Sequence, residues 1–392
     1  MKQRLDGLAV FRELLKDGAV AAFRELLQDC CRNDADNFVS HCGEFESLLF
    51  QQSDCWTAYL RRAVMESENV CIRNWASGAV TAVQEECLNR ELAFLNRLSQ
   101  VTLDDLTAGL DHAPDFLVGW RTEGGSIAQD YRQRMQEVGE KGYGIFARYH
   151  MFTVENGQLV PVKHPDPQQL KQLPGYEQER QKVIANTQAL LDGKPANNVL
   201  LYGDAGTGKS SAIKAIANNF AEQGLRLVEV KKNQLYQIPD LMDALAANPL
   251  KFILFIDDLS FTSNDDNFAA LKAILEGSVG GRAQNIAVYA TSNRRHLIKE
   301  TMTDRSGDDI HESDTRQELM SLSARFGLTV TFASPDRDRY LYIVGELAKQ
   351  YGVDLDEHTL AVRSEAFAIR MGGRSARVAK QFIELCKSGV QV

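Results

Sequence analysis

The sequence lacks the features that mark membrane-spanning, exported or zinc-binding proteins. None of its apolar stretches approaches the length of a membrane span, since NNVLLYG and FILFID are both strand-sized. The first residues, MKQRLDGLAVFRELL, carry charges throughout and contain no uninterrupted apolar block of a secretory signal. Six of the seven cysteines lie between residues 30 and 87, yet no CxxC occurs. We therefore expect a cytoplasmic protein with reduced thiols, no membrane partner and no zinc site.

Two further absences narrow the class of function. The formal net charge of −9 over 392 residues argues against a protein whose main role is to coat DNA. A GTPase needs an N-K-x-D string to select its base, and that string does not occur. Hydrophobic residues make up 44% of the chain and charged residues 25%, which is typical of soluble globular proteins. The length allows two or three domains, each with its own core.

The pattern of residues divides the chain into four segments. Residues 1–140 repeat apolar side chains at helical spacing and predict an all-α N-terminal domain. Residues 141–174 contain the turn signal Asn156-Gly157, typical of a hairpin, and then a proline-rich linker. Residues 175–334 alternate five short apolar strands with helices, which predicts a five-stranded parallel sheet covered on both faces. Residues 335–392 predict a small helical lid.

A phosphate-binding motif follows the first strand of this α/β core. The string GDAGTGKS at 203–210 matches G-x-x-x-x-G-K-[ST] and lies between the strand NVLLY and a helix. Its glycines let successive backbone N–H groups point at an anion at the helix N-terminus. Lys209 brings a positive charge to the β- and γ-phosphates, and the hydroxyl of Ser210 can bind Mg²⁺. The predicted nucleotide-binding residues here are Gly203, Asp204, Ala205, Gly206, Thr207, Gly208, Lys209, Ser210 and Ser211.

A second motif ends the strand FILFI with two adjacent acids, Asp257 and Asp258. A carboxylate at the end of a buried strand is costly unless it meets a cation. Because ligands of parallel α/β sheets bind outside the carboxyl ends of the strands, this strand brings Asp257 beside the phosphate loop. We therefore expect Asp257 to hold Mg²⁺ together with Ser210, and Asp258 to orient or deprotonate an attacking water. The alternative for Asp258 is a helix-capping or solvated acid.

Residues 175–388 resemble an AAA+ ATPase module. The stretches GYEQERQKVIANTQALLDGKPANNVLLYGDAGTGKSS and YATSNRRHLI are similar to a family of uncharacterised bacterial AAA+ ATPases, the DUF815 group. The string FIDDLSF, with Asp as its second acid, is also similar to the replication-initiator branch of AAA+ proteins. The resemblance covers somewhat over half of the chain, and the N-terminal 150 residues carry no recognisable motif. It implies an α/β P-loop AAA+ core, a helical lid, ATP and Mg²⁺ as cofactors, and ATP hydrolysis.

The resemblance also implies roles for residues beside the base and the γ-phosphate. It puts Gly175 and Tyr176 near adenine, where the tyrosine ring either stacks on the base or belongs to the core. Asn293, at the end of the strand YATSN, matches the sensor 1 residue, whose amide hydrogen-bonds the γ-phosphate or the attacking water. The alternative for Asn293 is a turn-forming residue at the end of a strand.

Three arginines complete the set of expected site residues. Arg325 precedes the fifth strand, where the family carries an arginine finger that reaches the γ-phosphate of a neighbouring subunit. The resemblance therefore implies a homo-oligomer, a ring such as a hexamer, although Arg325 in an intrachain salt bridge is the alternative. Arg374 and Arg377 match the sensor 2 region of the lid and are expected one helical turn apart. The sequence does not choose between these two.

Three hypotheses for the function follow from these motifs. The first is an ATPase that remodels or regulates a macromolecular partner, an unknown protein client, which the helical N-terminal domain selects. The second is a DNA-associated ATPase of the initiator or helicase-loader type. The basic residues that would contribute to DNA binding are Arg294, Arg295 and, in the helical lid, Arg363, Arg370, Arg374, Arg377 and Lys380. The third is an ATP-dependent binding switch with little turnover. Protein threading is disfavoured because no glycine follows Tyr236, and a small-molecule kinase would need no helical domain after the sheet.

Overall fold

The structure, a computed structural model, describes residues 1–111, 116–260, 267–276, 283–293 and 324–390. It separates the chain into two compact units, Met1–Arg148 and Tyr149–Val392. Arg294 and Arg295 lie outside the described residues. Among the described residues, no helix combines the length and the apolar character needed to cross a membrane.

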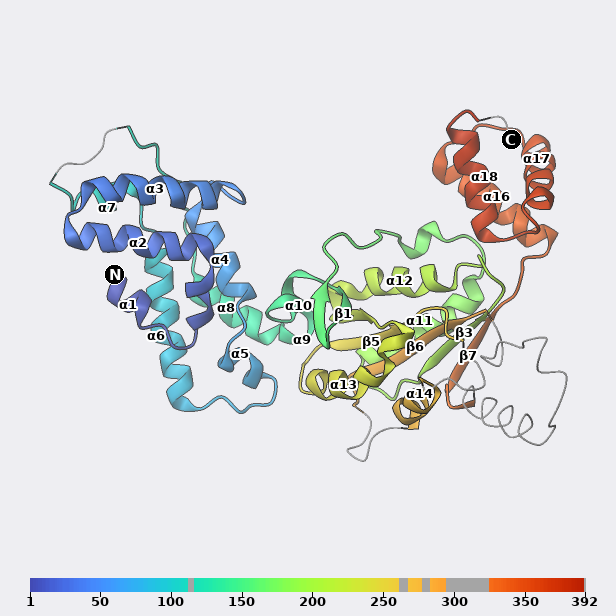
Figure 1. Ribbon diagram of the computed structural model, residues 1–392, viewed down its shortest axis with the longest axis horizontal. Coiled ribbons are helices and arrows are strands. Elements are labelled where there is room, and N and C mark those ends of the chain that lie inside the picture. Colours follow the sequence, from blue (N-terminus) through green and yellow to red (C-terminus); the bar gives the residue numbers. More distant parts are fainter. Residues whose placement is uncertain (112–115, 261–266, 277–282, 294–323, 391–392) are drawn as a thin grey trace. The chain divides into compact units, whose positions relative to one another are not determined.

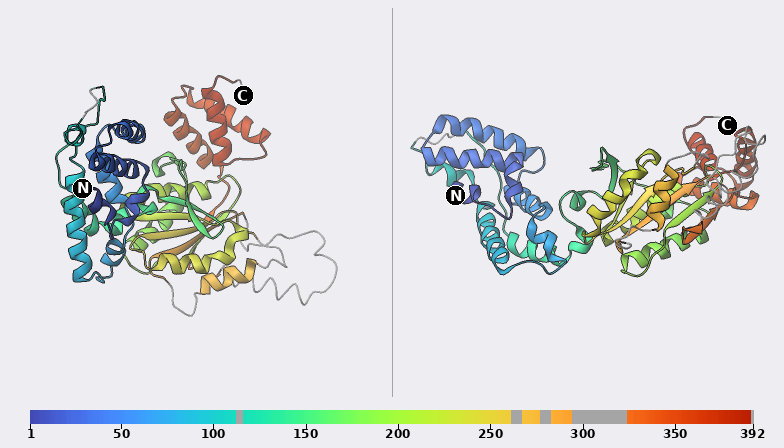
Figure 2. Two further views of the ribbon diagram at one scale, coloured as in Figure 1. Left: turned by 60° about the vertical axis from the view of Figure 1, so that its left-hand side comes forward. Right: turned by 60° about the horizontal axis from the view of Figure 1, so that its bottom comes forward.

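The N-terminal unit is built from short and medium helices, and α2 and α3 lie side by side in the views of Figures 1 and 2. Several helices start at a side chain that accepts a backbone N–H, as Asp17 does from Val20 at the start of α2. The helices are α1 (Lys2–Asp6), η1 (Arg12–Lys16), α2 (Gly18–Arg32), α3 (Ala35–Phe50), α4 (Trp56–Glu66), α5 (Val70–Trp75), α6 (Ala82–Leu98), α7 (Leu103–Thr107), α8 (Ile127–Gln136), α9 (Val138–Lys141) and α10 (Ile145–Arg148).

Aromatic rings form the centre of this unit. Phe23 of α2 stacks on Trp56 of α4 with ring centroids 4.7 Å apart, and Phe45 of α3 meets Trp120 edge-on at 4.7 Å. Both indole N–H groups find carbonyl acceptors, since Trp56 Nε1 donates to Leu98 O at 3.0 Å and Trp120 Nε1 donates to Val101 O at 2.9 Å. Buried polar groups that are paired in this way cost little stability. The apolar helix faces predicted from the sequence therefore form a core.

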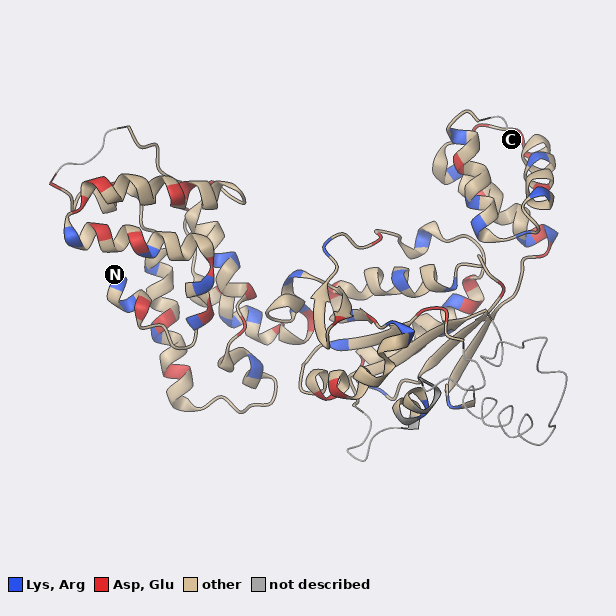
Figure 3. Cartoon of the chain, in the orientation of Figure 1, with Lys and Arg blue, Asp and Glu red and all other residues tan. Residues whose placement is uncertain are grey.

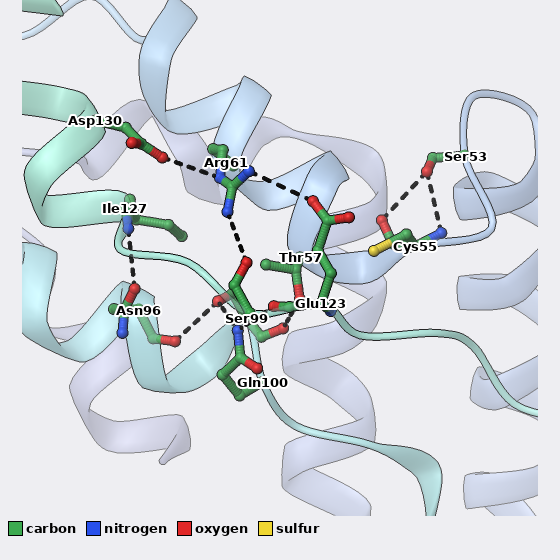
Figure 4. Close-up of polar contacts among 11 residues, drawn as sticks. Ser53, Cys55, Thr57, Arg61, Asn96, Ser99, Gln100, Glu123, Ile127 and Asp130 are labelled. Atoms are coloured by element: carbon green, nitrogen blue, oxygen red, sulfur yellow. Dashed lines mark hydrogen bonds and ion pairs between the residues drawn. The ribbon is translucent and has the colours of Figure 1, made fainter.

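Polar contacts connect the loop before α8 to α4 and α6 (Figure 4). Arg61 of α4 pairs with Glu123, at 3.4 Å, and with Asp130, at 3.1 Å. The backbone N–H of Glu123 donates to Thr57 Oγ1 at 3.0 Å, and the Thr57 hydroxyl donates to Ser99 O at 2.7 Å. These contacts hold an irregular segment on the helices of the N-terminal unit.

The second unit contains a seven-stranded sheet in the order β2-β1-β4-β5-β6-β3-β7. All neighbouring strands are parallel except β1 and β2, which form an antiparallel hairpin whose β1 pairs with β4. The strands are β1 (Met151–Glu155), β2 (Gln158–Pro161), β3 (Val199–Gly203), β4 (Leu225–Glu229), β5 (Lys251–Ile256), β6 (Ile286–Ser292) and β7 (Leu328–Phe332).

The five parallel strands β3 to β7 are those expected from the sequence. The predicted count of five is nevertheless too low for the whole sheet, because the hairpin assigned to the linker adds β1 and β2 at its edge. Phe152 of β1 is fully buried and pairs with Val228 of β4. Without the hairpin, β4 would be an edge strand with unpaired backbone groups, and β1 pairs with these groups.

Helices cover both faces of the sheet (Figure 1). Right-handed crossovers place α12 on one face and α13 and α14 on the other, because the chain moves along the sheet in opposite directions in these connections. Strand β5 is therefore buried along nearly its whole length. The helical segments here are η2 (Leu170–Gln172), α11 (Glu177–Leu191), α12 (Lys209–Phe220), η3 (Ala221–Gln223), η4 (Lys232–Gln237), α13 (Ile238–Ala246) and α14 (Asn267–Glu276).

In the described part of the chain, three helices follow the last strand, and we refer to them by the predicted name, the lid: α16 (Arg337–Tyr351), α17 (Glu357–Arg370) and α18 (Ala376–Lys387). Each starts at a capping side chain, namely Asp336, Asp356 and Ser375. Since Ser375 is the N-cap of α18, Arg374 lies before this helix. The expectation that Arg374 and Arg377 are one turn apart on the same helix is therefore wrong.

Candidate functional site

A cavity of about 590 Å³ lies at the edge of the sheet where β3, β5 and β6 end. Its volume is within the usual range for small-molecule sites. One wall consists of residues 205–211 with Asp257, Asp258, Thr291 and Asn293. The rest of the lining combines the apolar or aromatic side chains of Leu173, Pro174, Tyr176, Ile343, Leu347 and Ala376 with the polar side chains of Gln168, Gln172, Arg180, Arg377 and Lys380. The apolar part of the cavity thus comes mainly from the segment before α11 and from the helices after β7.

The phosphate loop makes a sharp turn against the last strand. Gly203 has φ of +141°, and a Cβ at this position would lie 2.0 Å from Phe332 O, so only glycine fits. Thr207 Oγ1 donates to Asp204 O at 2.9 Å inside the loop. The backbone then enters α12 at Lys209, so the first turn of this helix points at the cavity.

Lys209 is 6% exposed, and all three of its ammonium protons are used within the protein. Lys209 Nζ donates to Gly203 O at 2.8 Å, Asp204 O at 2.7 Å and Asn293 Oδ1 at 3.0 Å. Burial lowers the pKa of Lys209, while the negative charge of Asp204 opposes that shift. A phosphate oxygen that accepts a hydrogen bond from this ammonium must displace one of these three oxygens.

Ser210 and Asp257 form a pair of oxygen ligands beside this lysine. Ser210 Oγ donates to Asp257 Oδ1 at 2.6 Å, and the carboxylate is half-buried at the end of β5. A carboxylate and a hydroxyl are hard oxygen donors of the kind that Mg²⁺ takes together with substrate phosphates. The donor set therefore fits Mg²⁺.

Asp258 and Asn293 meet at the ends of neighbouring strands. Asn293 Nδ2 donates to Asp258 Oδ1 at 2.9 Å, while Asn293 Oδ1 accepts from Lys209. Asp258 has φ of +50°, an uncommon conformation for a residue other than glycine, and it is exposed to the cavity. One amide thus links the lysine of the phosphate loop to the second acid. Among the described residues, the other carboxylate oxygen of Asp258, Oδ2, accepts no side-chain hydrogen bond, and Asp258 lines the cavity.

Thr291 is a site residue that the sequence reasoning missed. It is 1% exposed, its hydroxyl donates to Asp257 Oδ1 at 2.6 Å, and its Oγ1 accepts from the Asp258 backbone N–H at 2.9 Å. Its position two residues before Asn293 puts both side chains on the same side of the chain. That spacing within the strand YATSN was the available signal.

Tyr176 does not have the free ring that stacking on adenine requires. The ring is 2% exposed, stacks on Phe332 with centroids 5.2 Å apart, and lies 4.9 Å from the guanidinium carbon of Arg339. Its hydroxyl donates to Ala333 O at 2.6 Å. The expectation of base stacking is therefore replaced by the alternative, a core tyrosine, which also contributes to the lining of the cavity. Gly175 lies beside it and packs against Ile343.

The structure separates the two lid arginines. Arg377 lines the cavity, and its backbone N–H donates to Gly206 O at 3.0 Å. Arg374 instead makes a two-nitrogen contact with Glu365, in which Nε donates to Oε1 at 2.9 Å and Nη2 donates to Oε2 at 2.7 Å. Of the two, only Arg377 lines this cavity.

Arg325 lies far from the phosphate loop of its own chain. It precedes β7, whose opposite end pairs Phe332 with Gly203. β7 runs four residue steps from Leu328 to Phe332, which corresponds to about 13 Å, and Arg325 lies three positions before its first residue. Arg325 is therefore at the amino edge of the sheet, and the cavity is at the carboxyl edge.

Two comparisons with known proteins bear on this chain. A model of the family described as "Protein of unknown function (DUF815)" matches residues 146–390, well over half of the sequence. Among solved structures, a RuvB mutant from Thermotoga maritima is similar over 55% of this chain and 63% of that chain, with 16% identity and a TM-score of 0.36. This chain thus spans less than two thirds of that neighbour, and a likeness at this TM-score supports no conclusion about function.

Proposed function

The chain belongs to the DUF815 family, as the resemblance in its sequence predicted, and we propose that it is an AAA+ ATPase that hydrolyses ATP to ADP and phosphate. One observation carries this proposal. The phosphate loop, the acids after β5 and the amide after β6 converge on one cavity and are joined by hydrogen bonds. A phosphate loop, a metal-binding acid and a water-positioning acid are the parts that phosphoryl transfer to water requires.

Lys209 and the backbone N–H groups of the loop bind the β- and γ-phosphates. The ammonium gives up an internal oxygen to do so, and the closest candidates are the carbonyls of Gly203 and Asp204. Because its charge is buried, its attraction for an anion is stronger than that of an exposed lysine. Arg377 adds a second positive charge from the lid.

Ser210 and Asp257 would hold Mg²⁺, which would supply positive charge to offset the charge that develops on the phosphates. Thr291 orients the Asp257 carboxylate through its hydroxyl. Asp258 accepts a proton from the attacking water through Oδ2, while Asn293 donates a hydrogen bond to Oδ1. Asn293 accepts a hydrogen bond from Lys209, so a movement of the Lys209 ammonium toward the γ-phosphate also affects the position of the Asn293 amide.

Arg325 acts on the site of a neighbouring subunit. Its position at the opposite edge of the sheet supports an action in trans, because it cannot reach the phosphates bound to its own chain. The active form is then a homo-oligomer, a ring such as a hexamer. The helical N-terminal domain, a separate compact unit with its own aromatic core, selects the protein client.

No described feature favours the DNA-associated alternative. Basic and acidic side chains are interspersed over the lid helices (Figure 3). Four of the lid cations form ion pairs: Arg339 with Glu179, Lys349 with Glu346, Arg374 with Glu365 and Lys380 with Glu384. Such a surface offers no continuous positive face to a phosphate backbone. The switch alternative differs from the ATPase only in turnover, and the experiment below distinguishes the two.

The test is Asp258→Asn, which keeps the shape and removes the proton acceptor. We expect unchanged binding of Mg-ATP and a loss of phosphate release of about a hundredfold or more. Asp240→Asn, an exposed acid in the first turn of α13, serves as the control and should keep full turnover. A wild-type chain that binds Mg-ATP but releases no more phosphate than Asp258→Asn would favour the switch.

A further inference from the structure

One peptide group in the short segment between the sheet and the lid is hydrogen-bonded through both its carbonyl and its N–H. The peptide between Ala333 and Ser334 follows β7 and precedes α16. Its carbonyl accepts from the Tyr176 hydroxyl at 2.6 Å, and its N–H donates to Asp204 Oδ2 at 2.7 Å. Rotation of this peptide plane breaks both hydrogen bonds at once. We call Tyr176, Asp204 and this peptide the junction clamp.

On one side of the clamp, Tyr176 lines the cavity together with Leu173 and Pro174. Tyr176 has φ of +61° and follows Gly175 at +76°, a left-handed pair that costs energy at the tyrosine. Arg180, 7% exposed, holds this conformation, because its guanidinium donates to the carbonyl of Gly175 and, at 2.5 Å, to that of Leu173. Leu173 itself lines the cavity, so displacement of this wall moves the residues that position Tyr176.

On the other side of the clamp, Asp204 is part of the phosphate loop. Its carbonyl accepts from Lys209 Nζ at 2.7 Å and from Thr207 Oγ1 at 2.9 Å, and its N–H donates to Phe332 O at 3.2 Å. The hydrogen bond from Ser334 lowers the pKa of the Asp204 carboxyl, so this residue remains an ionised acceptor. Any phosphate that draws Lys209 away removes a bond from the residue that also holds Ser334.

The lid rests on the same two segments. Arg377 at the start of α18 donates its backbone N–H to Gly206 O at 3.0 Å. On the other side, a Cβ at Gly175 would lie 2.9 Å from the side chain of Ile343 in α16. The phosphate loop therefore contacts both the lid and the Ala333–Ser334 peptide. The segment of Gly175 and Tyr176 likewise contacts both.

We propose that Tyr176 and Asp204 are positioning residues, and that a nucleotide sets the orientation of the lid through the junction clamp. The inference rests on the proposed function, since it requires a nucleotide in this cavity. The base end acts on the clamp through the wall that carries Tyr176, and the phosphate end acts on it through Lys209 and Asp204. Both ends of one ligand thus act on one peptide.

The first arm of the test needs no nucleotide. In the full chain, hydrogen–deuterium exchange of the Ser334 amide is resolved by fragmentation mass spectrometry. Tyr176→Phe and Asp204→Ala should each speed this exchange about tenfold, the effect of losing one hydrogen bond. Asp204→Asn keeps a carbonyl oxygen in the same place and should retain most of the protection.

Matched controls remove similar bonds inside the lid. Tyr340→Phe deletes a buried hydroxyl that donates to Ser364 O at 3.1 Å, and Asp356→Ala deletes a carboxylate that accepts from the Thr359 N–H at 2.9 Å. Both should change Ser334 exchange by less than about twofold. Exchange at Ser334 that is the same in the clamp variants and in these controls overturns the proposal.

The second arm adds saturating Mg-ATP. In the wild type, exchange at Ser334 and in the first turn of α16 should change at least threefold. The double variant Tyr176→Phe/Asp204→Ala should lose that response even at ATP concentrations that fill its site. Binding is measured separately by equilibrium dialysis. A wild type that binds no Mg-ATP refutes the proposed function itself. A wild type that binds it without a change at Ser334 refutes the clamp alone.

Discussion

Thr291→Val is the substitution whose effect follows most directly from the geometry. Valine keeps the volume and the branching of the side chain, so the change removes two hydrogen bonds from a residue that is 1% exposed. A bond to a charged carboxylate contributes about 1.5–3 kcal/mol and a neutral one about 0.5–1.5 kcal/mol. Asp257 keeps the bonds from Ser210 and from the Asp258 N–H. We therefore expect a loss of about 2 kcal/mol in the free energy of unfolding.

The same substitution should weaken the metal site. Removal of a group that orients a metal ligand typically costs about 10- to 100-fold in metal affinity or activity. Asp257 loses such a group in Thr291→Val, so the Mg²⁺ concentration at half-maximal ATP hydrolysis should rise about tenfold or more. The stability and metal effects have one cause and should appear together.

The assay can separate the two units of the chain. All three tryptophans lie in the N-terminal unit, so their fluorescence in urea follows that unit, while far-UV circular dichroism follows both. In Thr291→Val, only the unfolding transition of the second unit, seen by circular dichroism but not by tryptophan fluorescence, should shift to lower urea concentration. Thr331→Val is the matched control, because Thr331 is exposed on β7 of the same sheet and should change stability by at most about 0.5 kcal/mol. Equal stability and equal Mg²⁺ dependence of the two variants would refute the reasoning.

Three further predictions concern other residues. Arg325→Ala and Asp258→Asn should each be inactive alone, yet mixed oligomers should regain phosphate release because one supplies the arginine and the other the acid; no rescue would exclude action in trans. Arg377→Ala should weaken binding of Mg-ATP about 10- to 100-fold, whereas Arg374→Ala should leave it near the wild-type value, and equilibrium dialysis compares them. Nδ1 of His41 lies 2.6 Å from the carboxylate of the buried Asp29 in α2, and this hydrogen bond raises the pKa of the imidazole above its ordinary value. Its stabilisation is complete below the unfolded pKa and is lost as pH rises through the folded one, so the tryptophan-monitored melting temperature should fall from pH 6 to pH 8. His41→Asn should remove that difference, and an unchanged fall would contradict the assignment.

The parts of this unit that could be predicted from the sequence are those with strong local signals. The phosphate loop needs glycine, lysine and serine at set spacing, and buried parallel strands read as short apolar runs. β3 therefore appears where NVLLYG predicted a strand, and β5 appears where FILFID predicted one. The convergence of Lys209 and Asp257 followed from the rule that parallel strands end at one edge.

The rest depends on contacts between residues far apart in the sequence. The bond between Asp204 and Ser334 spans 130 residues, and no local pattern announces it. The family resemblance implied that the Tyr176 ring lies at the base, but in the structure this ring packs against Phe332. The hairpin joins the sheet for a similar reason, because the edge of β4 needed a partner that only the folded chain supplies.

Equilibrium binding of Mg-ATP to the wild type, Lys209→Ala and Lys214→Ala tests the central claim most directly. Lys214 lies on the same helix but pairs with Glu229 at 3.3 Å, away from the cavity. We predict that the wild type and Lys214→Ala bind Mg-ATP alike and that Lys209→Ala binds at least about a hundredfold more weakly. Equal affinity of Lys209→Ala and the wild type would contradict the account.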